Sequence, residues 1–216
     1  MDFESFSKIS RLSKEMVITE KIDGTNAQIA MEVYGRGIDE CLRDWPVAFA
    51  KEVEGGTLCM FAGSRTRWIT PGKQTDNSGF ARWVSEHGEE LLALGDGRHF
   101  GEWWGQGIQK NYGLKEKRFS LFNTARWTSK FNDGNTMDSD TRCLEIPSCY
   151  VVPVLYTGEF DTEKIWKVLM VDLKVGGSKA APGFMKPKGV VIYHTAGGYF
   201  FKKSIENDES PKSLVK

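Results

Sequence analysis

The sequence predicts an α+β fold of mainly antiparallel sheets with helices packed outside them, and two observations carry this prediction. Short segments rich in β-branched and aromatic residues recur between Gly, Pro or Asn residues, which is typical of β-strands. Only two segments keep the helical period, and they do not alternate regularly with the strands as in a parallel βαβ fold. The predicted strands are residues 16–22, 27–33, 57–62, 98–103, 118–122, 150–156, 189–194 and 199–204.

The two predicted helices each have apolar side chains on one face. The first has Ser78 available as its N-cap, and its apolar face consists of Phe80, Trp83, Val84, His87 and Leu91. We expect the second to begin at Asp161 or Thr162 and to end at Gly176 and Gly177. Its apolar face consists of Ile165, Val168, Leu169 and Leu173.

The composition is that of an ordinary globular chain of 216 residues, with 40% hydrophobic and 27% charged residues. We expect one domain over residues 1–205, followed by a polar tail over residues 206–216. The 29 basic residues are balanced by 29 acidic ones. Proteins that wrap a long duplex usually have a basic excess, so any nucleic-acid surface here is expected to be a local patch.

The spacing of the cysteines and the length of the apolar segments limit which classes of protein remain possible. Cys41, Cys59, Cys143 and Cys149 form no CxxC pair and have no histidine at ligand spacing, so no zinc site is predicted. The N-terminal residues include no apolar signal segment, and no run of 18 apolar residues exists. We therefore expect a cytoplasmic protein without a membrane partner.

The most informative segment surrounds Lys21. This lysine ends an apolar strand and precedes a turn indicated by Asp23 and Gly24, after which a second strand resumes at residue 27. A lysine before a hairpin turn is commonly a solvated charge at the edge of a sheet. A functional interpretation therefore needs support from the rest of the chain.

That support is a series of motifs in a fixed order. The KIDG sequence at 21–24, followed by Thr25 and Asn26, resembles the KxDG nucleophile motif of the ATP-dependent RNA ligases. These enzymes belong to the covalent nucleotidyltransferases, with DNA ligases and mRNA capping enzymes. Further segments resemble the later motifs of the same family: SRTR at 64–67, GEWWG at 101–105, FSLFN at 119–123, KGVVI at 188–192 and FKKS at 201–204. The resemblance implies an ATP-grasp-like nucleotidyltransferase domain over residues 1–205.

The resemblance also implies a three-step reaction. Lys21 attacks the α-phosphate of ATP and keeps AMP on its nitrogen. The AMP then moves to a 5′-phosphate end, and a 3′-hydroxyl attacks that end and releases AMP. RNA ends are the implied partners, Mg²⁺ or Mn²⁺ the implied cation, and RNA repair the implied setting.

Cations near Lys21 are expected to act on the phosphates. Attack needs an unprotonated amine, and neighbouring positive charges together with partial burial favour that form. By resemblance Lys202 contacts the α-phosphate, with Lys203 as the alternative. Arg65 belongs to the same set, and with Arg67 and Trp68 it is a candidate receiver for the 5′-phosphate of the strand to be joined.

The resemblance assigns the nucleoside to other side chains. Glu102 would accept a hydrogen bond from a ribose hydroxyl, or alternatively form a structural pair with an arginine. Phe122 would stack on adenine, with Phe119 as the alternative; either side chain also suits the core. The full set of implied nucleotide-binding residues is Glu20, Ile22, Asn26, Arg65, Glu102, Phe122 and Lys202.

Two positions depart from the family pattern. Lys188 stands where the fourth motif usually has a Glu associated with the metal, and Asn123 stands where the third motif usually ends in Asp. The residues that hold the metal therefore stay unassigned, and a non-catalytic nucleic-acid-binding relative is one alternative.

A DNA-ligase-like nick sealer is the second alternative function. About a dozen residues follow Ser204, too few for the OB domain usual in DNA ligases and capping enzymes, so we expect a minimal form. Capping enzymes usually have Arg at the position of Asn26, so the Thr25-Asn26 pair favours an RNA ligase.

Overall fold

The computed structural model describes residues 2–35, 46–72, 75–134 and 140–208, which fall into two compact units. The small unit consists of Met1–Lys21, Val154–Lys179 and Met185–Lys216. The large unit consists of Ile22–Pro153 and Ala180–Phe184. Each contains one mostly antiparallel sheet and a few helices, which confirms the α+β prediction.

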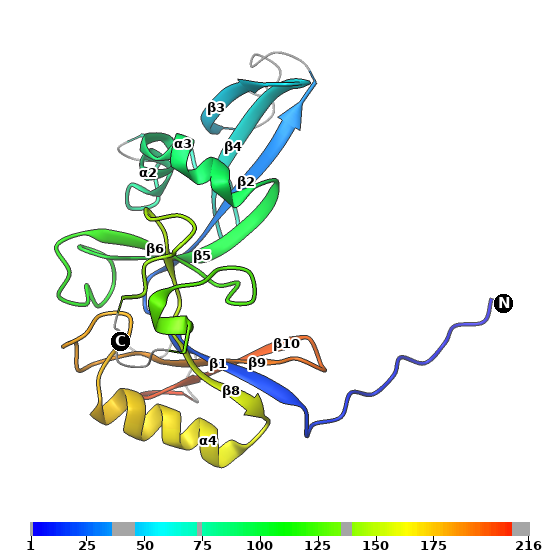
Figure 1. Cartoon of the computed structure of the whole chain (residues 1–216), viewed down its shortest axis with the longest axis vertical. Coiled ribbons are helices and arrows are strands. Elements are labelled where there is room, and N and C mark those ends of the chain that lie inside the picture. The colour runs from blue at the N-terminus through cyan, green and yellow to red at the C-terminus, as the bar shows by residue number, and fades with distance from the viewer. Residues whose placement is uncertain (1, 36–45, 73–74, 135–139, 209–216) are drawn as a thin grey trace. The chain divides into compact units, whose positions relative to one another are not determined.

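The small unit is a four-stranded antiparallel sheet with strand order β10-β9-β1-β8. Its strands are β1 (Glu15–Lys21), β8 (Val154–Glu159), β9 (Gly189–His194) and β10 (Tyr199–Ser204). Helix α4 (Thr162–Lys167) continues into a π-helix, η3 (Val168–Val175), and covers one face of this sheet (Figure 1). Asp161 caps α4 by accepting a hydrogen bond from the Glu163 N–H, as predicted.

The burial pattern of β1 explains which face of the small sheet is covered. Met16 and Ile18 are fully buried and pack against Val168, Leu169 and Leu173 of η3. Val17 and Thr19 alternate with them and are only half-buried. The sheet therefore has one apolar face under the helix and one partly exposed face.

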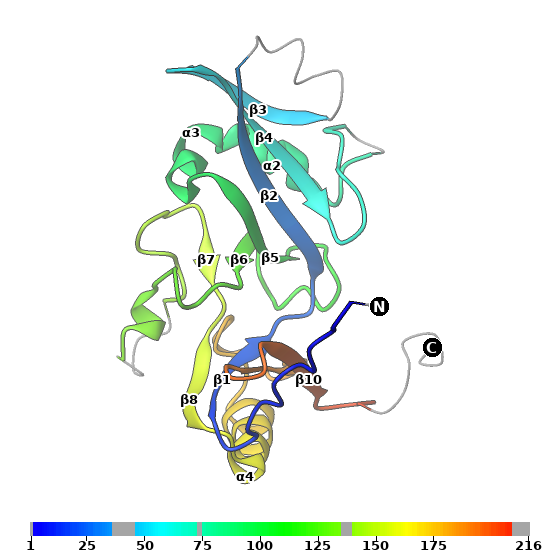
Figure 2. The same ribbon diagram turned by 90° about the vertical axis from the view of Figure 1, so that its right-hand side faces the viewer.

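The large unit is a six-stranded sheet with order β3-β4-β2-β5-β6-β7 (Figure 2). Its strands are β2 (Thr25–Tyr34), β3 (Val47–Val53), β4 (Gly56–Ser64), β5 (Gly97–Gly105), β6 (Lys117–Leu121) and β7 (Tyr150–Val151). Only the β6–β7 pair is parallel. The helical segments are α2 (Phe80–Glu86), α3 (Gly88–Leu91) and the 3₁₀ segments η1 (Leu92–Leu94) and η2 (Lys130–Asn132).

Aromatic packing holds α2 against one face of the large sheet. Phe80 is fully buried, with its ring centroid 5.4 Å from that of Trp103 and 5.1 Å from that of Phe119. Trp83 packs against the same two rings. Such pairs stabilise a core beyond their area of burial, by about 0.5–1.5 kcal/mol each.

Ser78 is not the N-cap of the first helix. The N-cap residue is Gly79, and Ser78 has φ 55°, so its side chain is not placed to cap the helix. The Asp76 carboxylate instead accepts hydrogen bonds from the N–H groups of Ala81 and Arg82. The predicted helix is also interrupted at His87, whose ring stacks on Trp83, so His87 lies partly in the core as expected.

Two strands differ from the prediction. The predicted strand 150–156 is two strands, because Pro153 has no N–H to donate and β7 and β8 belong to different sheets. Strand β3 was not predicted: its register shifts between Val47 and Phe49 and its second half is exposed, so its hydrophobic alternation is weak.

Three of the four cysteines lie within the described residues. Cys59, Cys143 and Cys149 are buried, and Cys41 lies outside the described residues. Burial raises the pKa of the Cys143 thiol to about 11, and its Sγ donates to the Glu145 carboxylate. Across the described part of the chain, none of the helices combines the length and apolarity that crossing a membrane requires.

Candidate active site

Lys21 is the last residue of β1 and lies opposite Gly189 of β9. Side chains alternate along β1, and Met16, Ile18 and Glu20 are all buried on the face covered by η3. Lys21 is therefore on the opposite face, where it is half-buried. This face is the one on which a strand-end amine can meet a ligand.

Strand register distinguishes Lys202 from Lys203. Lys202 lies opposite Val191, which in turn lies opposite Thr19, so Lys202 is on the same face of the sheet as Lys21. Two strand spacings and a two-residue offset put the Lys21 and Lys202 Cα atoms roughly 12 Å apart. That separation is within the combined reach of two lysine side chains.

Lys203 is on the face covered by the helices. Its Nζ lies 3.0 Å from the Asp208 carboxylate and 5.3 Å from the centroid of the Trp166 ring. Lys203 also contributes to lowering the pKa of Asp208, after the Ser204 N–H. These contacts give Lys203 a structural role, so of the two candidates Lys202 is the one on the face of Lys21.

Glu20 has a buried carboxylate, 1% exposed, immediately before Lys21. It accepts hydrogen bonds from the Ser178 hydroxyl at 2.6 Å and from the Lys179 N–H at 2.7 Å. A buried carboxylate is tolerated only when it is bonded in this way. Its side chain therefore fixes the end of β1 to the segment that follows η3, a role that sequence reasoning had not assigned.

The turn after Lys21 is held by two contacts within the large unit. The Asp23 N–H donates to the Tyr112 hydroxyl at 2.8 Å, and the Gly24 N–H donates to the Glu102 carboxylate at 2.9 Å. A Cβ on Gly24 would lie 2.4 Å from the Trp103 carbonyl oxygen and 2.7 Å from the Trp104 Cβ. Only glycine fits here, which gives a steric reason for the Gly of the motif.

Asn26 and Glu102 are direct neighbours on β2 and β5, because they occupy opposite positions in the register. Phe122 follows β6, and its N–H donates to the Phe100 carbonyl at 2.9 Å, which puts Phe122 opposite Phe100. Phe100 is two residues from Glu102 on β5, so Phe122 is on the same face of the sheet as Glu102. Phe122 is 37% exposed, whereas Phe119 is fully buried in the core on the other face. Of the two aromatic candidates, only Phe122 is accessible to a base.

Ile22 is also in the large unit, and its side chain is 3% exposed. It packs with Trp104, Tyr112 and Val152 in a separate apolar cluster. The Ile22 side chain therefore has a packing role.

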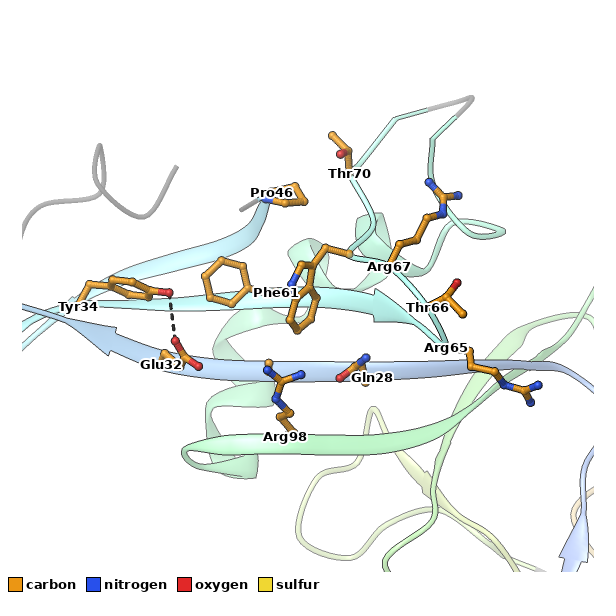
Figure 3. Close-up of a pocket in the computed structure, with 12 residues that line it drawn as sticks. Gln28, Glu32, Tyr34, Pro46, Phe61, Arg65, Thr66, Arg67, Thr70 and Arg98 are labelled. Atoms are coloured by element: carbon orange, nitrogen blue, oxygen red, sulfur yellow. Dashed lines mark hydrogen bonds between the residues drawn. The ribbon is translucent and has the colours of Figure 1, made fainter. Parts of the chain in front are cut away.

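Arg65 follows β4 and lines a cavity of about 740 Å³ on the same face of the large sheet as Asn26 and Glu102. Arg67 and Trp68 line the same cavity, as does Arg98 of β5 (Figure 3). Sequence reasoning grouped the first three residues but missed Arg98. Its contribution depends on the register of β5 with β2, which the local sequence does not specify.

The two positions that depart from the family pattern have structural contacts. Lys188 is half-buried before β9, and its carbonyl accepts a hydrogen bond from the Ile205 N–H. The Asn123 side-chain oxygen accepts from the Arg126 N–H and stabilises a turn. Within the described ranges, no group of three or more His, Cys, Asp or Glu side chains is placed to hold a metal ion.

The structure thus groups the predicted residues within each unit. In the small unit, Lys21 and Lys202 share a face of the sheet. In the large unit, Asn26, Glu102 and Phe122 share a face. Arg65 borders that same face at the cavity.

Comparisons with known proteins bear on the family and the fold of this chain. The sequence profile of the RNA ligase family matches residues 14–207. Among solved structures, the apo form of one point mutant of Naegleria gruberi RNA ligase matches with a TM-score of 0.53 and 17% identity, over 94% of this chain and 52% of that one. A second point mutant of that ligase, solved with ATP and Mn, matches with a TM-score of 0.50 and 17% identity, over 90% and 51%. The chain therefore spans about half the length of these relatives, and no curated protein matches it.

Proposed function

Because the chain belongs to the RNA ligase family, we propose that it is an ATP-dependent ligase that carries AMP on Lys21 and joins 5′-phosphate to 3′-hydroxyl ends of RNA. The observation that carries this proposal is the register of the small sheet. It puts Lys21 at a strand end on a partly exposed face, with Lys202 on the same face across β9. An unprotonated amine with a cation nearby is the arrangement that phosphoryl attack requires.

In the first step the unprotonated Nζ of Lys21 attacks the α-phosphorus of ATP. A P–N bond forms, the bond to the bridging oxygen breaks with its electron pair leaving on pyrophosphate, and the amine proton goes to water. Lys202 stabilises the negative charge that spreads over the phosphate oxygens. The buried carboxylate of Glu20 keeps the end of β1 in place through Ser178 and Lys179.

In the later steps the 5′-phosphate of RNA takes the AMP from Lys21. The 3′-hydroxyl then attacks that phosphate and releases AMP. The proposal assigns Arg65 to the 5′-phosphate, because a guanidinium donates two parallel hydrogen bonds to phosphate oxygens.

The face of the large sheet supplies residues suited to a nucleoside. Glu102 and Asn26 offer adjacent polar groups for ribose hydroxyls, and Phe122 offers an accessible ring for adenine. We assign the backbone of Glu20 to the adenine amino group. Ile22 contributes through its backbone, since its side chain is packed with Trp104.

In the part of the chain that the structure describes, no group of three or more His, Cys, Asp or Glu side chains could hold a divalent cation. Lys188 occupies the position at which the family usually has Glu. Mg²⁺ commonly binds through substrate phosphates with few protein ligands, and we propose that a cation here accompanies ATP in that way. The match to a structure solved with ATP and Mn supports testing both Mg²⁺ and Mn²⁺.

The proposal is tested by incubating the protein with ATP labelled on the α-phosphate. Wild type should acquire label with Mg²⁺ or Mn²⁺, and Lys21→Ala should lose it completely. Lys51→Ala is the matched control, since Lys51 is an exposed strand lysine paired with Glu89, and it should label like wild type. Absence of label with ATP under either metal would overturn the proposed catalysis, and label from GTP or NAD instead would change its nucleotide.

A second candidate function is nucleic-acid binding without catalysis, which the charge reversal at Lys188 favours. The same experiment separates the two, because a non-catalytic relative would bind RNA but acquire no label. For a labelled enzyme, a panel of 5′-phosphorylated RNA and DNA ends then distinguishes an RNA ligase from a nick sealer of DNA.

A further inference from the structure

The cavity beside Arg65 has chemistry that AMP transfer to Lys21 does not use. It lies on strands β2, β4 and β5, and we call it the arginine cavity after Arg65, Arg67 and Arg98, which line it together with aromatic side chains (Figure 3). Its volume of about 740 Å³ is in the range of small-molecule sites. We propose that the arginine cavity binds one unpaired nucleotide of the RNA strand that the enzyme joins, an inference that rests on the proposed function.

The cavity is on the same sheet face as the proposed nucleoside site. Arg98 and Glu102 are four residues apart on β5, so their side chains share a face and their Cα atoms are roughly 13 Å apart. Gln28 lies two residues beyond Asn26 on β2 and lines the cavity. A strand whose end lies near Glu102 can therefore continue along this face into the cavity.

The arginines suit a phosphate. Arg65, Arg67 and Arg98 are all exposed, and among the described residues that line the cavity one carboxylate, Glu32, stands against these three cations. The Arg98 guanidinium carbon lies 5.4 Å from the centroid of the Trp68 ring, which holds that side chain beside the cavity. Guanidinium groups bind phosphate oxygens in pairs, so these side chains favour a nucleic-acid backbone.

The aromatic side chains suit a base. The Phe61 ring centroid lies 5.7 Å from that of Trp68 and 6.2 Å from that of Tyr34, so the three rings form a continuous aromatic wall. Trp68 is half-buried and pairs through its backbone with Gly63 of β4, which fixes the ring position. Stacking of one base on such a ring is worth about 5- to 150-fold in affinity.

Glu32 gives the cavity a direction. Its carboxylate accepts a hydrogen bond from the Tyr34 hydroxyl at 3.1 Å, and in Figure 3 this pair lies at the opposite end from Arg65. A carboxylate repels phosphate but accepts hydrogen bonds from exocyclic amino groups of bases. The phosphate should therefore lie between Arg98 and Arg65, with the base towards Glu32, which favours cytosine, adenine or guanine over uracil.

The floor of the cavity has a polar group with spare capacity. The Gln28 amide nitrogen donates to the Ser64 carbonyl at 3.1 Å, while its buried side-chain oxygen has no hydrogen-bond partner among the described residues. Leaving such an oxygen unsatisfied is costly, and a donor on the ligand would satisfy it once a shift of the Gln28 side chain uncovers the oxygen.

The nucleotide must be unpaired to use this wall. Bases in an A-form duplex are stacked on their neighbours, and side chains cannot reach their faces. An aromatic wall is available only to a base that has left a helix or belongs to a single strand. The proposed substrate is therefore an RNA end with at least one unpaired nucleotide.

The experiment measures binding of a fluorescent 5′-phosphorylated single-stranded RNA by anisotropy, with a blunt RNA duplex of the same length as comparison. Arg98→Gln and Trp68→Leu should each weaken single-strand binding about 10-fold. Arg98→Gln should also reduce the slope of log affinity against log salt by about one, whereas Trp68→Leu should leave that slope unchanged. Glu32→Gln should reduce the preference for cytosine over uracil.

Matched controls are Arg82→Gln, an exposed arginine on α2 paired with Glu86, and Trp166→Leu, a tryptophan of α4 that is 52% exposed. Both should bind RNA like wild type. Equal binding of the duplex, or unchanged binding by Arg98→Gln, would overturn the proposal even if Trp68→Leu failed to fold. Labelling of wild-type Lys21 is measured separately, so loss of the proposed catalysis and loss of this site give different results.

Discussion

The two units of the chain use their sheets in the same way but present different chemistry. In each, one sheet face packs under helices and the other carries the proposed functional groups. The open face of the small sheet is cationic, with Lys21 and Lys202. The open face of the large sheet has its arginines at the arginine cavity, and beside that cavity it combines a carboxylate, an amide and an aromatic ring, from Glu102, Asn26 and Phe122.

This difference separates two tasks in the proposed reaction. Phosphoryl transfer needs positive charge around a nucleophile, and nucleoside recognition needs hydrogen-bond acceptors and a stacking surface. The chain passes from one unit to the other between Lys21 and Ile22, directly after the proposed nucleophile. Variants in the two units should therefore fail in different ways.

The largest effect is expected for Gly24→Ala in the large unit. Its Cβ would lie 2.4 Å from a backbone oxygen, so the turn that Glu102 holds must move. We expect adenylation to fall at least about 100-fold, because a displacement of about 1 Å has that effect on catalysis. We also expect destabilisation of about 1–3 kcal/mol in denaturant unfolding. Gly35→Ala is the control, since its added Cβ would lie 4.0 Å from the nearest described atom outside its chain neighbours, and equal behaviour of the two variants would contradict this account.

Lys202→Ala should produce the next largest effect, now in the small unit. Removing the cation proposed to stabilise the transition state should lower the rate of adenylation by about 100-fold, with little change in stability. Lys203→Ala should keep adenylation within a few-fold of wild type and lose at most about 1 kcal/mol of stability, because its ion pair with Asp208 is partly exposed. Single-turnover labelling and thermal unfolding distinguish the two. The reverse ranking of these neighbours would show that the assignment by sheet face is wrong.

Lys188→Glu should have a smaller effect, which appears in how adenylation depends on the metal ion. Restoring a carboxylate before β9 should raise adenylation several-fold or change the preference between Mg²⁺ and Mn²⁺. Lys186→Glu makes the same charge change two residues earlier and should alter neither. A metal titration of labelling decides the matter, and identical curves for wild type and Lys188→Glu would show that this position is not linked to the metal.

The smallest expected effect is a dependence of stability on pH, which arises from His99 in the core of the large unit. Burial lowers the pKa of His99, assisted by the nearby charge of Arg126 and opposed by the hydrogen bond to the Gly95 carbonyl. The unfolded chain therefore binds a proton more readily, and stability should fall as the pH drops below the ordinary histidine pKa of about 6.5. We expect the melting temperature to decrease by about 2–4 °C between pH 7.5 and 5.5.

Tryptophan fluorescence follows this change, because Trp103 and Trp104 are buried in the large unit. His99→Gln should flatten the pH dependence. A melting curve with the same slope in both proteins would remove His99 as its cause.

Local sequence patterns located most of the strands and one helix start. Strands β9 and β10 have the predicted bounds, and Asp161 caps α4 as expected. Each depends on nearby residues, on alternation or on a short polar side chain before a helix. Ser78 failed as a cap because Asp76 accepts the same class of hydrogen bond from farther along the chain.

The sequence by itself determined the motif order, and with it the family, the nucleophile candidate Lys21 and the glycine turn after it. Only the tertiary structure showed that Lys202, and not Lys203, shares a face with Lys21, and that Phe122, and not Phe119, is accessible. In both pairs the two side chains are chemically similar, and the choice depends on which face of a sheet each occupies. A shift of one residue in strand pairing reverses that face, and pairing is set by strands far apart in the chain.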